Sequence, residues 1–217
     1  MKKTMVVFIS AMVCILLCGF TIFNNEQDSF YFDVNDLYNY QKQFKSEEMD
    51  ICSSNSTKTY MDYRLTSDPT SRQYWFIKDN LKVDKSGFLY DKDGFIAVAL
   101  GSYFGSIGDR FYITLDTGIV LPLVKAEEKA NKDVYNGCYH KHDGSVIEFV
   151  TDTDKAGSYF GVYGNGLVLQ GNYNNHELFS GEIIKVEKVT DEKIGSSITY
   201  KNGEPLFNKL FSYASGY

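Results

Sequence analysis

The sequence has no excess of positive charge, little proline and almost no tryptophan. Its 22 lysines and arginines are outnumbered by 28 aspartates and glutamates, which gives a formal net charge of -6. Without a basic stripe that could neutralise phosphates, nucleic acid is not an expected partner. Only three prolines and one tryptophan occur, against 17 tyrosines and 16 phenylalanines. Because aromatic residues favour strands, we expect a folded, mainly β domain rather than a disordered chain.

The four cysteines lack the spacing of the common metal and redox motifs. There is no C-x-x-C and no H-E-x-x-H, and no cofactor is indicated. Cys52 and Cys138 could pair in an oxidising compartment or stay as two buried thiols, and the sequence does not decide between these alternatives. His140 and His142, followed by Asp143, could hold a metal from one face of a strand, but we interpret them as an exposed polar loop.

The N-terminus carries a long uncharged apolar run. After Lys2 and Lys3, about 19 residues from Met5 to Phe23 contain no charge, which is the length that a helix needs to cross a membrane. The positive end should stay in the cytoplasm, so the rest of the chain faces outward. We favour an uncleaved transmembrane anchor over a cleaved signal peptide, because no A-x-A pattern follows. The predicted location is the cell membrane, with a single pass and the domain outside; secretion is the alternative.

Four segments are expected along the chain. They are an anchor or signal peptide at 1–25, a polar spacer at 26–56 with helical character around 34–49, a β-barrel domain at 57–190 and a tail at 191–217. Alternating or apolar runs separated by turn residues predict strands at 59–65, 95–100, 109–115, 119–124, 145–150 and 181–189. The 71–77 stretch is either a short helix or extended, 127–134 a loop or short helical turn, and the glycine-rich 157–171 a hairpin or a long loop. Pro122 should place its strand near an edge or a bulge.

Several short motifs occur in a fixed order in this domain. They are Tyr-Met-Asp-Tyr-Arg at 60–64, Ser-Arg-Gln at 71–73, a glycine-bounded strand and loop at 96–105, Gly-Asp at 108–109, and the strand at 144–150. From Thr59 to Thr153 this order resembles exported clostridial-type proteins with a double-psi β-barrel, the fold of the 3D domain in lytic transglycosylases and of barwin-like proteins. The expected fold is therefore mainly β, with a small double-psi-like β-barrel behind an N-terminal transmembrane or signal helix.

The resemblance also implies two acidic site residues. Glu148 stands where the strand acid of the transglycosylase-type domains would protonate a glycosidic oxygen, and Glu127 where a loop acid shapes the cleft. Asn131 occupies the place of a second loop aspartate, and asparagine cannot shuttle a proton. Strand alternation puts Glu148 on the face opposite Ile147 and Phe149, where partial burial would suit a general acid. The alternative for both glutamates is a solvated surface position.

Two functions follow as hypotheses. The first is an envelope domain that cleaves or remodels peptidoglycan as a lytic transglycosylase or hydrolase, with Glu148 as the acid. The second is a non-catalytic domain that binds cell-wall glycan or an envelope protein through its aromatic residues. The aromatic residues that motivate binding are Tyr103, Phe104, Tyr159, Phe160 and Tyr163. Asp62 is expected to brace Arg64, and the 101–105 glycine loop to be a turn, since it lacks the lysine of a phosphate-binding loop.

Overall fold

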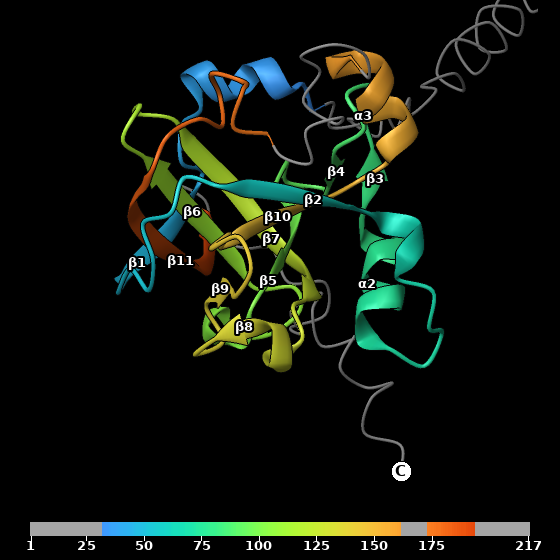
Figure 1. Ribbon diagram of the computed structural model, residues 1–217. Coiled ribbons are helices and arrows are strands. Elements are labelled where there is room, and N and C mark those ends of the chain that lie inside the picture. Colours follow the sequence, from blue (N-terminus) through green and yellow to red (C-terminus); the bar gives the residue numbers. More distant parts are fainter. Residues whose placement is uncertain (1–31, 162–172, 194–217) are drawn as a thin grey trace, which may run out of the picture.

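In the computed structural model, the structure describes residues 32–161 and 173–193 (Figure 1). These residues are mainly β, as the sequence predicts, with a nine-stranded mixed sheet, a separate two-stranded sheet and few helices. The predicted anchor at 1–25 lies outside the described residues, as does most of the tail predicted at 191–217; its first three residues, 191–193, are instead the end of a strand. Within the described part, no helix is long and apolar enough to span a membrane.

The elements follow one another closely along the chain. The strands are β1 (Phe44–Met49), β2 (Lys58–Asp62), β3 (Lys82–Val83), β4 (Leu89–Tyr90), β5 (Ile96–Leu100), β6 (Arg110–Leu115), β7 (Val120–Glu128), β8 (Val134–Tyr135), β9 (Tyr139–His140), β10 (Ile147–Thr151) and β11 (Ile183–Lys193). The helices are η1 (Val34–Asn39), η2 (Tyr63–Leu65), α2 (Arg72–Asn80), η3 (Ser102–Phe104), η4 (Asn131–Asp133) and α3 (Thr153–Phe160).

The large sheet is mixed and its strand path is open. Its order is β1-β11-β6-β7-β5-β10-β2, with β4 attached to β5 and β3 to β4. The β5–β7 and β10–β2 pairs are parallel, and the other pairs are antiparallel. Among the described residues the path does not return on itself, and no closed barrel is found. Figure 1 shows β1 and β11 at one side of the sheet and both α2 and α3 at the other.

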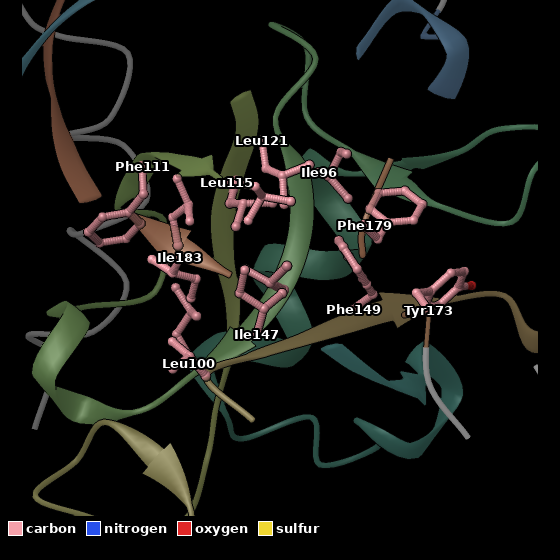
Figure 2. Packing of buried hydrophobic residues seen from close by; sticks show 14 of the residues in the cluster. Ile96, Leu100, Phe111, Leu115, Leu121, Ile147, Phe149, Tyr173, Phe179 and Ile183 are labelled. Carbon is pink, nitrogen blue, oxygen red and sulfur yellow. The ribbon is translucent and has the colours of Figure 1, made fainter. Parts of the chain in front are cut away.

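Strand alternation divides the apolar residues between the two faces of the sheet. In β5, Ile96, Val98 and Leu100 join one hydrophobic core, while Ala97 and Ala99 join the other. Figure 2 shows the first core, where the aliphatic side chains of the central strands meet an aromatic group that includes Phe149 and Phe179. The helix α2 covers the second core with Phe76 and Ile77. This second face is the one that carries the candidate site.

The structure corrects the prediction for the polar spacer. Phe32, Val34 and Leu37 are buried in the first core, so the 3-10 helix η1 is already part of the folded body. The chain then forms β1, which pairs with β11 along its whole length. Only helical character is expected here, because the six residues of β1 are Phe-Lys-Ser-Glu-Glu-Met, which form a polar edge strand with a single buried side chain.

Two further expectations can be compared with the structure. Pro122 lies in β7, in the interior of the sheet, paired with Tyr112 of β6, and the predicted nearby bulge is present, since the register with β5 shifts between Lys125 and Glu127. The strand tolerates proline there because the β5 pairing begins only at the next residue, Leu123. The start of the glycine-rich stretch is the helix α3, which Asp152 caps by accepting a hydrogen bond from the backbone N–H of Lys155. The part from 162 to 172 lies outside the described residues.

Candidate functional site

One row of side chains crosses four strands on the face that α2 covers. Thr59 of β2 pairs with Glu148 of β10, and Glu148 pairs with Ala99 of β5. Ala99 in turn pairs with Glu127 of β7. Because directly paired residues in neighbouring strands point to the same face of a sheet, the two glutamates share a face with only the small side chain of Ala99 between them. The row brings together the two acids that the sequence singled out.

A β-bulge places Glu127 in this row. The register shifts between Val98 and Ala99, so that β7 advances from Lys125 to Glu127 while β5 advances by one residue. The bulge turns Glu127 toward the face of Ala99. The prediction of a loop or helical turn at 127–134 is therefore wrong at its start, since Glu127 and Glu128 end a nine-residue strand.

The Glu127 carboxylate is held by hydrogen bonds from the first turn of α2 and from the segment that leads into it. Its two carboxylate oxygens accept hydrogen bonds from Thr66 Oγ1 and from Gln73 Nε2, each at 2.8 Å. Ser71 begins the helix by accepting from the backbone N–H of Tyr74, which fixes the position of Gln73 in the first turn. One segment, distant from β7 in sequence, thus sets the direction of the Glu127 carboxylate.

The surroundings favour the protonated form of Glu127. Burial raises the pKa of Glu127, the neighbouring negative charge of Glu148 raises it further, and the hydrogen bond from Thr66 opposes both effects. A carboxyl group whose pKa is raised, next to a second carboxyl group, is an arrangement that acid–base catalysis uses.

Glu148 lies on the face that alternation predicts. Its neighbours Ile147 and Phe149 are buried in the first core, while Val150 joins the second. The Glu148 side chain is half-buried, and among the described residues it has no hydrogen-bond partner. A carboxylate that is partly accessible and not engaged by the protein is available to a ligand.

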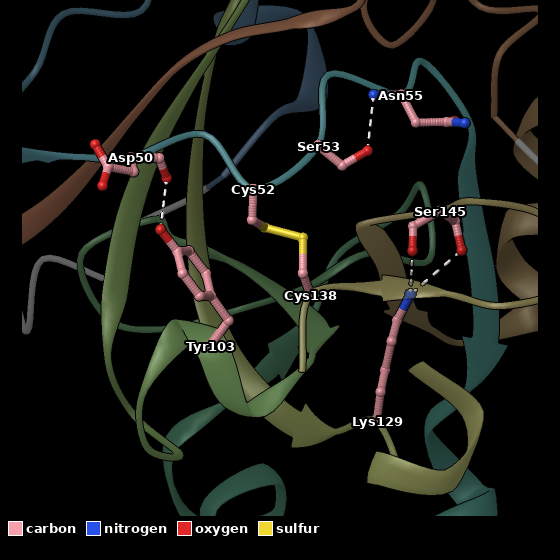
Figure 3. Close-up of a disulfide and its surroundings, with 8 residues drawn as sticks. All are labelled: Asp50, Cys52, Ser53, Asn55, Tyr103, Lys129, Cys138 and Ser145. Carbon is pink, nitrogen blue, oxygen red and sulfur yellow. Dashed lines mark hydrogen bonds between the residues drawn. A yellow bond between two sulfur atoms is a disulfide. The ribbon is translucent and has the colours of Figure 1, made fainter. Parts of the chain in front are cut away.

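The sequence analysis missed a third charged residue, Lys129. This lysine follows the end of β7 and is only 7% exposed. Its Nζ donates to the backbone oxygen of Ser145 at 3.1 Å and to Ser145 Oγ at 3.3 Å (Figure 3). Burial lowers the pKa of Lys129, and the negative charges of Glu148 and Asp143 oppose that effect. No sequence signal marks it, because a lysine in a polar segment is ordinarily solvated.

Asn131 and Asp62 lie apart from the acid pair. Asn131 begins the short helix η4, and its Oδ1 accepts a hydrogen bond from Ser102 Oγ at 2.8 Å, so it holds the glycine loop. Asp62 accepts from Arg64 Nε at 2.7 Å and from Arg64 Nη2 at 2.6 Å. The expectation that Asp62 braces Arg64 is confirmed.

The glycine loop at 101–105 and His140 make contacts within the fold. The ammonium of Lys125 donates to the backbone oxygens of Gly101 and Gly105, at 2.9 and 2.7 Å. These two hydrogen bonds connect the two ends of the loop. His140 lies in β9 of the small hairpin, with its Nδ1 3.4 Å from Asp143 Oδ1. In the part of the chain that the structure describes, no three His, Cys, Asp or Glu side chains are grouped so that they could hold a metal ion.

A disulfide joins Cys52 to Cys138, which the sequence left undecided (Figure 3). Their Cα atoms are 6.1 Å apart, and 86 residues separate them along the chain. The bond ties the segment between β1 and β2 to the β8–β9 hairpin. Tyr103 reinforces this connection, since its hydroxyl donates to the backbone oxygen of Asp50 at 2.9 Å.

The aromatic residues proposed for glycan stacking are divided between core and surface. Phe104 is buried, and Phe160 packs against the first core. Tyr103 and Tyr159 are exposed by 37% and 40%, and Tyr163 lies outside the described residues. Of the four described residues in this group, two contribute to the interior and two are partly exposed at the surface.

Comparisons with known protein families, with curated proteins and with solved structures found no significant match for this chain.

Proposed function

We propose that this domain cleaves glycosidic bonds of a cell-wall glycan, with Glu127 as the general acid and Glu148 as the second carboxylate. One observation carries the proposal: two glutamates from different strands share one face, and the charge of one raises the pKa of the other. This exchanges the roles that the sequence suggested, because Glu127 is the residue whose surroundings favour a proton. The export predicted for the N-terminal segment supports a substrate outside the membrane.

The proposed hydrolysis follows the inverting route, in which a water molecule lies between the sugar and the base. Adjacent strands lie about 4.8 Å apart, so the backbones of Glu127 and Glu148, separated by β5, are roughly 10 Å apart. Glycosidases that invert the anomeric configuration place their carboxyl groups about 6.5–9.5 Å apart, which leaves room for a water between the sugar and the base. Ala99 lies between the two acids and adds no atom beyond Cβ, and it is itself buried in the second core.

The double-psi arrangement is part of this proposal. Two parallel pairs, β5–β7 and β10–β2, flank the antiparallel contact between β10 and β5, and this mixture supports a relationship to the double-psi barrel. Glu127 lies near the end of β7 and Glu148 near the start of β10, on either side of β5. The barrel itself stays a prediction.

The test is a cleavage assay with purified cell walls. The full chain in detergent micelles would be incubated with insoluble wall, and released fragments would be measured by reducing-end assay and mass spectrometry. Glu127→Gln and Glu148→Gln should each lower the rate by about 100-fold or more, which is typical for the loss of an acid or base. Glu47→Gln, on the exposed part of β1, is the matched control and should leave the rate unchanged.

The products separate the alternatives. A hydrolase gives reducing ends, whereas a lytic transglycosylase gives anhydro sugars without consuming water. Wall that retains the protein but is never cleaved would overturn the catalytic proposal and favour the non-catalytic binding function. Equal rates in the wild type and both glutamine variants would exclude the acid pair as the catalytic centre.

A further inference from the structure

The only tryptophan of the chain lies at the surface of the helix α2. Trp75 is 44% exposed, although tryptophan is a residue that folding usually buries to a large extent. Phe76, the next residue of the helix, is buried in the second core. Leu65, in the short helix η2 that precedes α2, is 71% exposed. One short stretch of the chain therefore presents two large apolar side chains to solvent.

The same stretch holds the carboxylate of Glu127. Thr66, which follows Leu65 directly, donates to one oxygen of this carboxylate. Gln73, two residues before Trp75, donates to the other oxygen. Because residues two apart in an α-helix are turned by about 200° from each other, Gln73 faces the sheet and Trp75 faces outward. A helix with its side chains is about 10–12 Å across, so roughly the width of one helix separates the indole from the proposed acid.

The indole of Trp75 is held in a fixed orientation. Its Nε1–H donates to the backbone oxygen of Pro69 at 2.8 Å. The ring of Tyr74 meets it edge-on, with the ring centroids 5.2 Å apart, and Lys78 Nζ lies 4.8 Å from the indole centroid. A ring that is already oriented loses little conformational freedom when a ligand binds to it. Since the protein engages the N–H group, the indole offers a ligand the face of its ring.

We propose that Trp75 stacks on a sugar ring of the same glycan whose bond the acid pair cleaves, and that this glycan runs over the N-terminal half of α2. The inference rests on the proposed function, since it adds a second contact to the same substrate. The faces of a pyranose ring carry C–H groups, which the negative face of an indole attracts. The exposed ammonium of Lys78 donates to hydroxyl or carbonyl oxygens at the same place.

The separation between the indole and the acids defines the class of substrate. A single sugar cannot contact Trp75 and Glu127 together, because the helix lies between them, whereas a chain of several sugars can. The substrate is therefore an oligosaccharide or polysaccharide. Short fragments lose the contact with Trp75 or the contact with the acids.

The emission of the full chain reports on this site alone, because the chain has one tryptophan. The chain would be kept in detergent micelles, with Glu148→Gln so that the probe is not consumed, and titrated with chitohexaose, a β-linked oligomer of N-acetylglucosamine. The emission of Trp75 should change in a saturable manner as the sugar replaces water at the ring. This measurement uses the intact indole and so does not depend on how well variants of Trp75 fold.

Calorimetry gives the affinities of the variants that lack the indole. Trp75→Ala should weaken the binding of chitohexaose by about 10-fold, which corresponds to one aromatic contact. Trp75→Tyr, which keeps an aromatic face, should retain most of the affinity. Tyr135→Ala removes an exposed ring from the β8–β9 hairpin and is the matched control, which should leave the affinity unchanged.

The inference is overturned if chitohexaose does not bind, if it binds without changing the emission of Trp75, or if Trp75→Ala binds it as tightly as its parent. Emission that shifts with protein concentration in the absence of sugar would assign the exposed ring to a second copy of the chain and would also overturn it. If cell walls are not cleaved but the sugar binds at Trp75, the proposed catalysis fails and this binding site stands. Cleavage of walls with an unchanged Trp75 emission refutes the binding site alone.

Discussion

Removing the Cys52–Cys138 disulfide should destabilise the domain without changing its folded structure. The bond closes a long loop, and its main effect is to restrict the unfolded chain. The folded hairpin keeps other attachments when the bond is absent. The backbone N–H of Tyr103 donates to the backbone oxygen of Gly137 at 3.0 Å. The ammonium of Lys129 donates to the backbone oxygen of Ser145, which follows the β8–β9 hairpin in the chain. We therefore expect native-like spectra in the reduced protein.

The magnitude follows from the length of the loop. For the 86-residue separation of the two cysteines, the chain-entropy relation gives about 4.6 kcal/mol at 25 °C, and measured values for native disulfides are commonly about 2–4 kcal/mol. For a domain of this size, each kcal/mol corresponds to roughly 2–4 °C in the melting temperature. A loss of about 10 °C is therefore expected.

The assay compares urea unfolding of the oxidised protein with that of a Cys52→Ser, Cys138→Ser double variant. Cys14 and Cys18 would be replaced by serine in both proteins, so that no other thiol is present. The double variant should unfold at a lower urea concentration, with an equal or steeper slope, because its unfolded chain is less compact. Identical unfolding midpoints would refute the reasoning, and peptide mapping that finds both thiols free in the non-reduced wild type would remove its basis.

Three further predictions concern titration and close packing. Because the folded-state pKa of Glu127 is raised, the wild type should lose stability as pH rises above about 4.3, the ordinary pKa of a glutamate; Glu127→Gln should abolish this loss in melting temperatures measured from pH 4 to 7. Burial lowers the pKa of Lys58 to about 8, so the unfolded chain binds more protons than the folded one between pH 8 and 10.5. The unfolding free energy should therefore gain up to about 3 kcal/mol across that range, and a Lys58→Met variant that shows the same gain would contradict the assignment. A Cβ on Gly101 would lie 1.9 Å from the backbone oxygen of Gly137, whereas one on Gly118 meets nothing within 4 Å; in chemical denaturation Gly101→Ala should cost about 3 kcal/mol and Gly118→Ala about 1 kcal/mol, and equal losses would show that packing at Gly101 is not the cause.

The central strands could be predicted because their signals are local. The apolar run at 95–100 is β5, the 109–115 run is β6, and the 119–124 run begins β7. The alternation from Ile184 predicted β11, and the direction of Glu148 followed from its two buried neighbours. These elements owe their structure to their own residues, so the sequence was sufficient.

The missed features depend on distant partners. The polar strand β1 is stabilised by β11, which lies at the other end of the described chain. Glu127 joins the acid row through a bulge, which shifts the alternation by one residue and cannot be seen from the periodicity of β7 alone. Lys129 is buried because of Ser145, and no property of its own segment indicates this. The pairing of Cys52 with Cys138 is likewise a result of the tertiary fold.

The pairing of β1 with β11 also has a consequence for biogenesis. Glu47 finds its partner Lys188 only after roughly 140 further residues have been made, which takes about 7–28 s at ribosomal rates of about 5–20 residues per second. Until then β6 presents an unpaired edge, which another copy of the chain could occupy. A nascent or truncated polypeptide that lacks β11 is therefore at risk of intermolecular strand addition, and its escape from aggregation depends on rapid completion of synthesis or on a chaperone that shields this edge.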